Sequence, residues 1–362
     1  MRDKEVDKAS FSRPEGVDPA AILTVVRIPR EWEKWRLDRV VHATFSRMSR
    51  TRAQGVVSAG AFAPDGRRLR SNDRVRFGDV VLLYRPPFLE PDVPMECPVL
   101  HEDDALLAID KPSGLPVHPT ARYHHHTVTA VLAKERPDQD LALCHRIDRE
   151  TSGVLLLAKD LESERFVKRA LELHVWDALA ASGNDRVHAV AKRYLCITWG
   201  VPVEKKGRIA HALKLDEHHR YRVKMRVADG EPDALAAATR YEVLQIRHRA
   251  GDPSNRYALI ACDLETGRQH QIRAHLAHVG APIVGDKLYA TARGLDDEVF
   301  GRGADGELTE ADLAALELPR HALHAHRMTL PHPRAPHAPV TITSPLPADL
   351  QAFWDALIEV AS

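Results

Sequence analysis

A dense group of charged residues stands near the middle of the sequence and is followed by an apolar run. The group consists of His145, Arg146, Asp148, Arg149 and Glu150. After a short turn of Thr, Ser and Gly, residues 154–158 are uninterrupted apolar residues, as expected of a strand buried on both faces. Asp148 therefore lies just outside a rigid strand, an arrangement that can hold an ionised carboxylate for chemistry. An exposed turn closed by a salt bridge fits this segment equally well, because structural ion pairs have the same sequence pattern.

The composition excludes several classes of protein. The chain has 362 residues, of which 44% are hydrophobic, so it can bury two ordinary cores or one large one. No apolar run is long enough to span a membrane, and the charged start lacks the apolar region of a signal peptide. The four cysteines are widely spaced without a CxxC pair, which favours reduced thiols in a cytoplasmic protein.

The net charge is zero but unevenly distributed. Residues 21–86 contain fourteen Lys and Arg against six Asp and Glu. A basic segment on a neutral chain predicts a polyanionic partner bound by one part of the molecule. A merely soluble, arginine-rich domain would have the same composition.

The pattern of apolar and turn residues predicts two folded regions. Residues 1–20 are polar without periodicity, and we expect a disordered tail. Residues 21–86 are predicted to form two short helices, a hairpin and a closing strand over 75–84. The Pro-rich segment 87–98 is typical of a stiff linker, and residues 99–362 form the second domain.

The second domain is predicted to be rich in strands. The expected strands are 105–109, 154–158, 194–201, 239–246 and 257–264. Few helical segments separate them, which predicts an α+β fold with a mixed, mainly antiparallel sheet. Residues 176–190 and 291–319 look like insertions, the second of them acidic and loop-like. A helix is expected from about Arg268 and ends at Gly280.

Residues 145–159 resemble the signature of the RluA-type RNA pseudouridine synthases. Further segments resemble other motifs of that family, in the family's order, and these are 110–119, 192–195, 266–275, 285–289 and 323–325. Residues 36–83 resemble the α-L RNA-binding module that is often fused in front of such enzymes. The resemblance implies an isomerase that converts uridine into pseudouridine in RNA.

The chemistry of that reaction needs an ionised carboxylate. The bond between ribose and the base nitrogen breaks, the base rotates, and a bond to carbon forms, so the anomeric carbon becomes electron-poor as in glycoside cleavage. A carboxylate can attack that carbon or remove a proton from the sugar, and in either role a cation must keep its pKa low. The resemblance implies Asp148 for the carboxylate and Arg273 for the cation. Because no redox step occurs, no cofactor or metal is expected.

The resemblance also implies residues that bind RNA. Arg146 would fill the gap left by the flipped uridine or hold the displaced phosphate, unless it is a surface arginine paired with Glu150. Tyr194 would stack on the flipped base and is a candidate for the late proton transfer, whereas a lone strand tyrosine usually packs in a core. Ile272 would pack against the base or in the core. Further substrate-binding candidates are His145, Arg268 and His270, and candidate phosphate contacts of the N-terminal module are Arg47, Arg50 and Arg52.

The 21 histidines raise the question of a metal site. None pairs with a cysteine at zinc spacing, and no HExxH motif occurs. His270 and His275 are five positions apart, so a helix would not place them on one face. We therefore predict no metal.

Taken together, these patterns predict a cytoplasmic, monomeric RNA pseudouridine synthase. Ribosomal and transfer RNA are both open as substrates, and the N-terminal module favours ribosomal RNA. Two alternatives belong to other classes of protein. One is a catalytically silent RNA-binding factor for ribosome assembly, and the other is a metal-dependent hydrolase.

Overall fold

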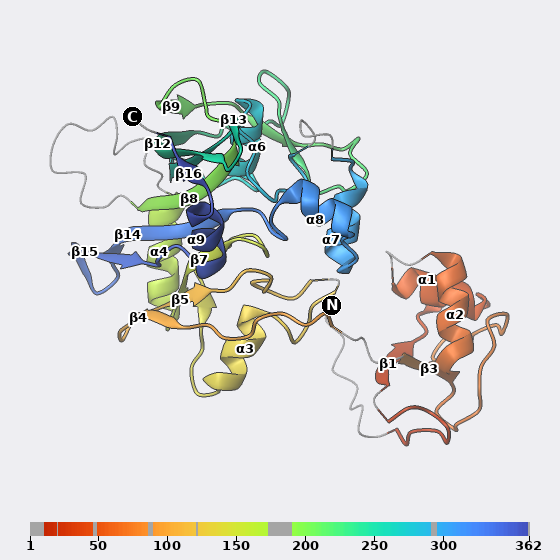
Figure 1. Ribbon diagram of the computed structural model, residues 1–362. Coiled ribbons are helices and arrows are strands. Elements are labelled where there is room, and N and C mark those ends of the chain that lie inside the picture. The colour runs from red at the N-terminus through yellow and green to blue at the C-terminus, as the bar shows by residue number, and fades with distance from the viewer. Residues whose placement is uncertain are drawn as a thin grey trace. The chain divides into compact units, whose positions relative to one another are not determined.

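The chain divides into two compact units, residues 1–89 and residues 90–362 (Figure 1). The computed structural model describes residues 11–19, 21–45, 49–85, 90–120, 122–172, 190–290 and 295–360. The division falls at the Pro-rich segment expected to be a linker. In this described part of the chain, no helix is both long enough and apolar enough to cross a membrane.

The N-terminal unit is a small α+β module. Its sheet has the order β1-β3-β2, and its elements are β1 (Ile22–Arg27), the 3-10 helix η2 (Arg30–Trp32), α1 (Leu37–Thr44), α2 (Arg50–Gly60), β2 (Ala61–Phe62) and β3 (Val80–Arg85). The Ser49 hydroxyl accepts a hydrogen bond from the Arg52 amide and so caps α2. Both predicted helices are therefore present. The closing strand is shorter than predicted, because a turn at Gly78 precedes β3.

Residues 11–19 differ from the expected disordered tail. Phe11 and Val17 pack against a cluster that includes Phe62 and Tyr84 of the module. Arg13 Nη1 donates to the Ala21 carbonyl at 3.2 Å. Two apolar side chains and one backbone contact thus anchor a segment whose average composition is polar. Residues 1–10 lie outside the described residues.

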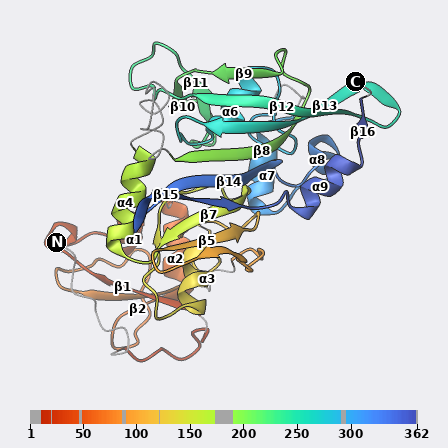
Figure 2. The same cartoon turned by 90° about the vertical axis from the view of Figure 1, so that its left-hand side faces the viewer.

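The second unit is organised around one 11-stranded sheet. Its main path is β16-β12-β13-β8-β14-β7-β5-β4, and β9, β15 and β6 pair with β12, β14 and β7. Figure 2 shows these strands stacked from β9 and β12, through β13, β8, β14 and β7, to β5. The strands are β4 (Val99–Glu102), β5 (Leu106–Lys111), β6 (Ala142–Leu143), β7 (Ser152–Ala158), β8 (Ala191–Trp199), β9 (Lys206–Ile209), β12 (Thr239–Arg249), β13 (Asp252–Leu264), β14 (Leu323–His332), β15 (Ala335–Thr343) and β16 (Ile358–Glu359). β7 and β14 pair in parallel and the other described pairs are antiparallel, which confirms the predicted α+β class.

The remaining elements of this unit include a small ladder and the helices. The ladder joins β10 (Leu213–Leu215) and β11 (Met225–Val227). The helices are α3 (Val128–Glu135), α4 (Leu161–Glu172), α6 (Gln271–His278), α7 (Glu298–Asp305), α8 (Glu310–Leu316) and α9 (Ala348–Asp355). α6 begins later than predicted, because His270 lies in the left-handed region with φ 54°.

The acidic insertion at 291–319 contains helical structure, so the expectation of a loop there was wrong. It includes α7 and α8, and Thr309 and Asp312 cap α8 reciprocally. Arg302 on α7 donates to both oxygens of Asp312 at 2.7 and 2.6 Å. Residues 291–294 and nearly all of the insertion at 176–190 lie outside the described residues.

Strand β7 is buried on both faces, as its sequence predicted. Leu155 and Leu157 pack in a cluster with Val128 of α3, while Leu156 packs on the opposite side with Val167 of α4. Because both faces are covered by helices, β7 gives the turn that precedes it a rigid base.

A buried histidine ties the start of β7 to β14 and to the end of β15. His324 Nδ1 lies 3.0 Å from Ser152 Oγ, and Nε2 lies 3.2 Å from the Ser344 carbonyl oxygen. Burial lowers the pKa of His324 to about 4. An exposed histidine has a pKa of about 6.5. Between these two values the unfolded chain binds more protons than the folded one, so stability falls as the pH drops through this window.

We expect His324→Gln to reduce the loss of stability on acidification. The change from pH 7 to pH 5 should cost wild type about 2 kcal/mol more free energy of unfolding than it costs the variant. Urea unfolding at both pH values measures this difference. The control is His218→Gln, at an exposed position, and it should lose as much free energy of unfolding as wild type between pH 7 and pH 5. An acid-induced loss in His324→Gln as large as that of wild type would contradict the assignment.

Candidate functional site

A cavity of about 650 Å³ lies among the turn before β7, strand β8 and the N-terminal end of α6. Every catalytic and substrate-binding candidate from the sequence lines it. These residues are His145, Arg146, Asp148, Tyr194, Arg268, His270, Ile272 and Arg273. The fold thus brings three separate stretches of the chain to one cavity.

Arg273 links two carboxylates in the wall of this cavity. Its Nη1 donates to Asp148 Oδ2 at 3.0 Å. Its Nε and Nη2 donate to the two oxygens of Asp286 at 2.7 and 3.0 Å. Asp286 is fully buried, whereas the Asp148 side chain is 31% exposed. Asp286 therefore anchors the guanidinium through two of its nitrogens, and the third nitrogen, Nη1, donates to the carboxylate that borders the cavity.

The surrounding charges keep Asp148 ionised. Burial favours a raised pKa, but the charges of His270 and Arg273 and the hydrogen bond from Arg273 oppose it, and the pKa of Asp148 lies below its ordinary value. Burial lowers the pKa of His270 to about 4, so this ring is neutral at pH 7. Arg273 is consequently the cation that stabilises the Asp148 carboxylate at neutral pH.

His270 is held from behind by a tyrosine. Its Nδ1 lies 3.1 Å from the Tyr289 hydroxyl, which accepts a hydrogen bond from the Met225 amide at 2.8 Å. A hydroxyl that accepts from the backbone can donate its own proton to Nδ1. The neutral ring then carries its proton on Nε2, which is 3.8 Å from Asp148 Oδ2. The left-handed backbone of His270 is a conformation that costs energy for a side chain of this kind.

The end of β5 and the residues after it support the Asp148 turn away from the cavity. Lys111 is fully buried, and its Nζ donates to the carbonyls of Pro112 at 2.7 Å, Leu115 at 2.9 Å and Arg149 at 3.0 Å. The Ser113 hydroxyl donates to the Glu150 carbonyl at 2.8 Å. These two residues position the turn and make no contribution to the cavity lining.

Arg146 is exposed and lines the cavity. The ion pair considered for it, with Glu150, is not formed. Glu150 instead accepts from Lys287 Nζ at 3.0 and 2.9 Å and from Arg149 Nη2 at 3.0 Å. Arg146 makes no ion pair with any residue that the structure describes, so its guanidinium is available to a ligand.

Tyr194 and Ile272 both belong to the apolar core and also line the cavity. Burial and the negative charge of Asp148 raise the pKa of Tyr194, so its phenol is protonated at neutral pH. Their positions fit both interpretations that the sequence left open, core packing and contact with a base.

His145 and Arg268 are partly engaged within the protein. His145 Nε2 accepts from the Leu156 amide at 3.1 Å, and burial lowers the pKa of this ring to about 3. Arg268 is exposed, and its Nε donates to the Ala236 carbonyl at 3.1 Å. His145 therefore reaches the cavity as a neutral ring fixed to β7, while Arg268 keeps free donors at its guanidinium end.

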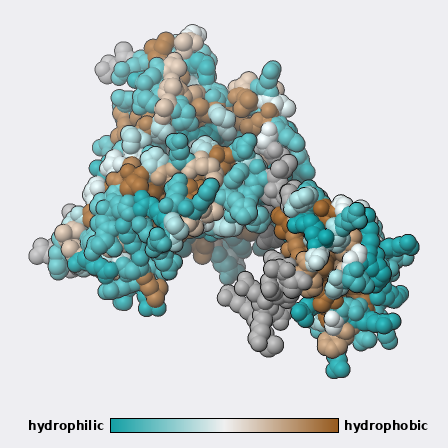
Figure 3. Space-filling model, turned by 90° about the horizontal axis from the view of Figure 1, so that it is seen from below, coloured by the Kyte–Doolittle hydropathy of each residue, from teal (hydrophilic) through white to brown (hydrophobic). Residues whose placement is uncertain are grey.

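In the N-terminal unit, two of the three predicted phosphate contacts are described. Arg50 and Arg52 are exposed, and Arg50 Nε lies 3.7 Å from the buried carboxylate of Asp38. Arg47 lies outside the described residues. Figure 3 shows mostly hydrophilic residues on the displayed face of this unit, and the exposed arginines among its described residues are Arg13, Arg27, Arg30, Arg39, Arg50, Arg52, Arg67, Arg68, Arg70, Arg74 and Arg76.

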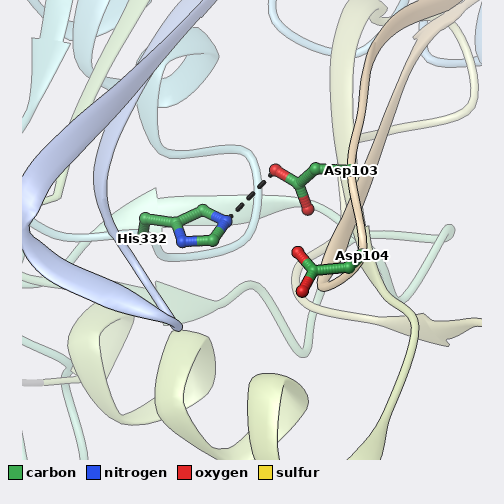
Figure 4. Close-up of side chains that lie close together, drawn as sticks. All are labelled: Asp103, Asp104 and His332. Atoms are coloured by element: carbon green, nitrogen blue, oxygen red, sulfur yellow. Dashed lines mark hydrogen bonds and ion pairs between the residues drawn. The ribbon is translucent and has the colours of Figure 1, made fainter.

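Among the described residues, Asp103, Asp104 and His332 could offer three metal ligands (Figure 4). Both oxygens of Asp103 are already engaged. Oδ1 accepts from the amides of Ala105 and Leu106 at 2.8 Å, and Oδ2 lies 2.6 Å from His101 and 3.1 Å from His332. This group joins the β4–β5 turn to the end of β14, and none of its members lines the cavity. We assign it a structural role.

Several residues that shape the site had no role assigned from the sequence. Asp286 and Tyr289 lie in the segment 285–289, which was noted as a motif without a function for either side chain. Lys111 lies in the segment 110–119, and Lys192 was noted only as the neighbour of Tyr194. Their positions inside motifs were the available signal, and their contacts could not be read without the fold.

Comparisons with known proteins find similar sequences and a similar fold. Residues 105–278 match the family model described as RNA pseudouridylate synthase. The chain is 35% identical to ribosomal large subunit pseudouridine synthase D of Xanthomonas campestris, over 90% of this chain and 89% of that protein. It is 33% identical to the protein of the same name from Xylella fastidiosa, with the same coverage. The solved structure of human RNA pseudouridylate synthase domain containing 1 shares the fold, with a TM-score of 0.54 and 19% identity over 76% of this chain and 94% of that one.

Proposed function

Because this chain belongs to the RluA-type RNA pseudouridine synthases, we propose that it isomerises uridines of large-subunit ribosomal RNA with Asp148 as the catalytic carboxylate. The observation that carries the assignment is the contact of Arg273 with Asp148 at the cavity. The names of its bacterial relatives support ribosomal RNA as the substrate. The intact set of Asp148, Tyr194 and Arg273 favours an enzyme over a catalytically silent assembly factor.

In this proposal the target uridine leaves its stack and enters the cavity. Arg146, which is exposed and forms no ion pair within the described part of the chain, occupies the gap or holds the displaced phosphate. Tyr194 and Ile272 contact the base, and His145, Arg268 and His270 complete its surroundings. Asp148 acts on the sugar, either by attack on the anomeric carbon or by removal of a proton. Arg273 holds the carboxylate in its ionised form during that step.

The N-terminal unit supplies electrostatic attraction to RNA. Its exposed arginines, Arg50 and Arg52 among them, are the phosphate contacts, and we include Arg47 with them. Such contacts release counterions, so RNA affinity should fall steeply as the salt concentration rises.

We further propose that the protein works as a monomer in the cytoplasm and needs no cofactor. Its four cysteines are free thiols, which supports a reducing compartment. The reaction is an isomerisation without a redox step, and Asp148 and Arg273 supply the charges that it requires.

Mapping of pseudouridines in total RNA tests the substrate. RNA from cells that lack the gene should lose pseudouridine at one or a few positions of large-subunit ribosomal RNA, and the purified protein should restore them in vitro. A loss confined to transfer RNA would overturn the ribosomal assignment. Failure of the purified protein to form pseudouridine in any RNA of these cells would favour the silent assembly factor.

A further inference from the structure

Lys192 is a cavity residue to which neither the sequence motifs nor the proposed function gives a task. It lies two positions before Tyr194 on β8, so both side chains project from the same face of the strand. Both line the cavity. Arg193, between them, points to the other face and donates to the two oxygens of Asp263 at 2.8 and 2.6 Å. Lys192 makes no hydrogen bond or ion pair with any residue in the described part of the chain.

The ammonium group of Lys192 lies in a recess of the cavity. Its Nζ is 3.9 Å from the point where a side chain on Gly267 would begin, and Gly267 leaves that space open. Its charge lowers the pKa of His145, which places it beside that ring. The recess therefore joins β8, the turn before β7 and the turn before α6.

Among the residues that the structure describes, no carboxylate forms an ion pair with Lys192. Burial lowers the pKa of Lys192 to about 8, and no carboxylate opposes the shift. The other titratable or charged groups that line the cavity are Cys144, His145, Arg146, Asp148, Lys168, Glu172, Tyr194, Arg268, His270 and Arg273. Lys168 is paired with Glu164 at 2.5 Å. A partly buried ammonium without a partner is costly, which favours a role in which an anion meets it during function.

We propose that Lys192 contacts the uracil of the target nucleotide and stabilises the negative charge that this base acquires when it separates from the sugar. This inference rests on the proposed function. When the C1′–N1 bond breaks, its electron pair stays on the base and is delocalised onto N1 and the two carbonyl oxygens. The base then rotates, C5 bonds to C1′, the C5 proton is removed and N1 takes up a proton, so the overall reaction is an isomerisation. Lys192 donates a hydrogen bond throughout and keeps its own proton.

The position of Lys192 favours the base over a phosphate. In the proposed function the sugar lies against Asp148, and that carboxylate is bound by Arg273 and forms no ion pair with Lys192. The exposed guanidinium of Arg146 is better placed for the RNA backbone. A charge that meets its partner only as the bond breaks stabilises the transition state more than the bound substrate, and it should therefore act on kcat.

Steady-state kinetics on large-subunit ribosomal RNA test the proposal. Wild type must first form pseudouridine, since its failure would count against the proposed function and not against Lys192. Lys192→Met should then lose about 10²–10³-fold in kcat with KM nearly unchanged, and Lys192→Arg should recover part of that loss. Arg193→Met changes the neighbouring residue on the opposite face of β8, and this variant should have the kcat and KM of wild type. Thermal unfolding of each variant checks that the fold is intact.

The pH dependence separates a chemical role from a structural one. The active form of Lys192 is the ammonium, so kcat/KM of wild type should decline as the pH rises past about 8. Lys192→Arg should move that decline to higher pH, because its guanidinium stays charged. A raised KM with unchanged kcat in Lys192→Met would overturn the proposal in favour of a phosphate contact. An unmoved alkaline limb in Lys192→Arg would overturn it as well.

Discussion

Asp148→Asn should abolish pseudouridine formation while leaving the fold intact. The amide has no negative charge, so it can neither attack the anomeric carbon nor remove a proton from the sugar. We expect activity to fall by about 10⁴-fold or more, as when an enzyme loses the group that performs its central step. The fold should survive, because Arg273 keeps both of its hydrogen bonds to Asp286 when the charge of Asp148 is removed.

Pseudouridine formed per minute, measured at saturating RNA, is the readout for this variant. Asp263→Asn is the matched control, since Asp263 also accepts from an arginine but lies on the opposite face of β8 and β13, and it should keep wild-type activity. Activity of Asp148→Asn within tenfold of wild type would contradict the assignment of the catalytic carboxylate. Normal RNA binding together with normal turnover in Asp148→Asn would contradict the assignment in the same way.

The arrangement of strands could be predicted, because a strand that is buried on two faces has an uninterrupted apolar sequence. The run 154–158 is apolar at every position, and β7 is covered by α3 on one face and α4 on the other. The insertion at 291–319 contains no such apolar run. Its two helices are held by local contacts, such as Arg302 with Asp312, that do not alter the hydrophobic pattern. Phe11 and Val17 are too few to reveal that their polar segment packs on the module.

The residues of the candidate site could be predicted from the sequence, but the contacts that hold them in position could not. Motifs identified the residues that line the cavity, because side chains that do chemistry are restricted in type and spacing. The contacts that position them join distant parts of the chain. Lys111 reaches the Arg149 carbonyl, and Asp286 holds Arg273 from behind. These depend on side-chain geometry, which a sequence does not contain.

The two interpretations of Asp148 that the sequence left open are compatible. Asp148 does form a salt bridge, with Arg273 at 3.0 Å. The pair borders a cavity, and the arginine is anchored by the second carboxylate of Asp286. The salt bridge is therefore the device that keeps the carboxylate ionised, and its removal should affect stability and activity together.

Arg273→Met should destabilise the protein and also inactivate it. Methionine leaves Asp148 and the fully buried Asp286 without their cation, and breaking a buried ion pair in this way costs about 3–5 kcal/mol. Activity should fall by about 10³-fold or more, because the pKa of Asp148 rises once its cationic partner is lost. Arg193→Met, which breaks an Arg–Asp pair that is partly exposed, should cost about 1 kcal/mol or less.

The pH dependence of Arg273→Met should have a characteristic sign. In wild type the pKa of Asp286 is lowered, chiefly by Arg273 against the effect of burial, so its contribution to stability is lost as the pH falls. In the variant, burial raises the pKa of both carboxylates above their unfolded values, so protonation stabilises the folded state. The difference in free energy of unfolding between wild type and variant should therefore shrink by at least about 1 kcal/mol from pH 8 to pH 5.5. Urea unfolding at the two pH values measures it, and a difference that stays constant or grows on acidification would show that Arg273 does not compensate these two charges.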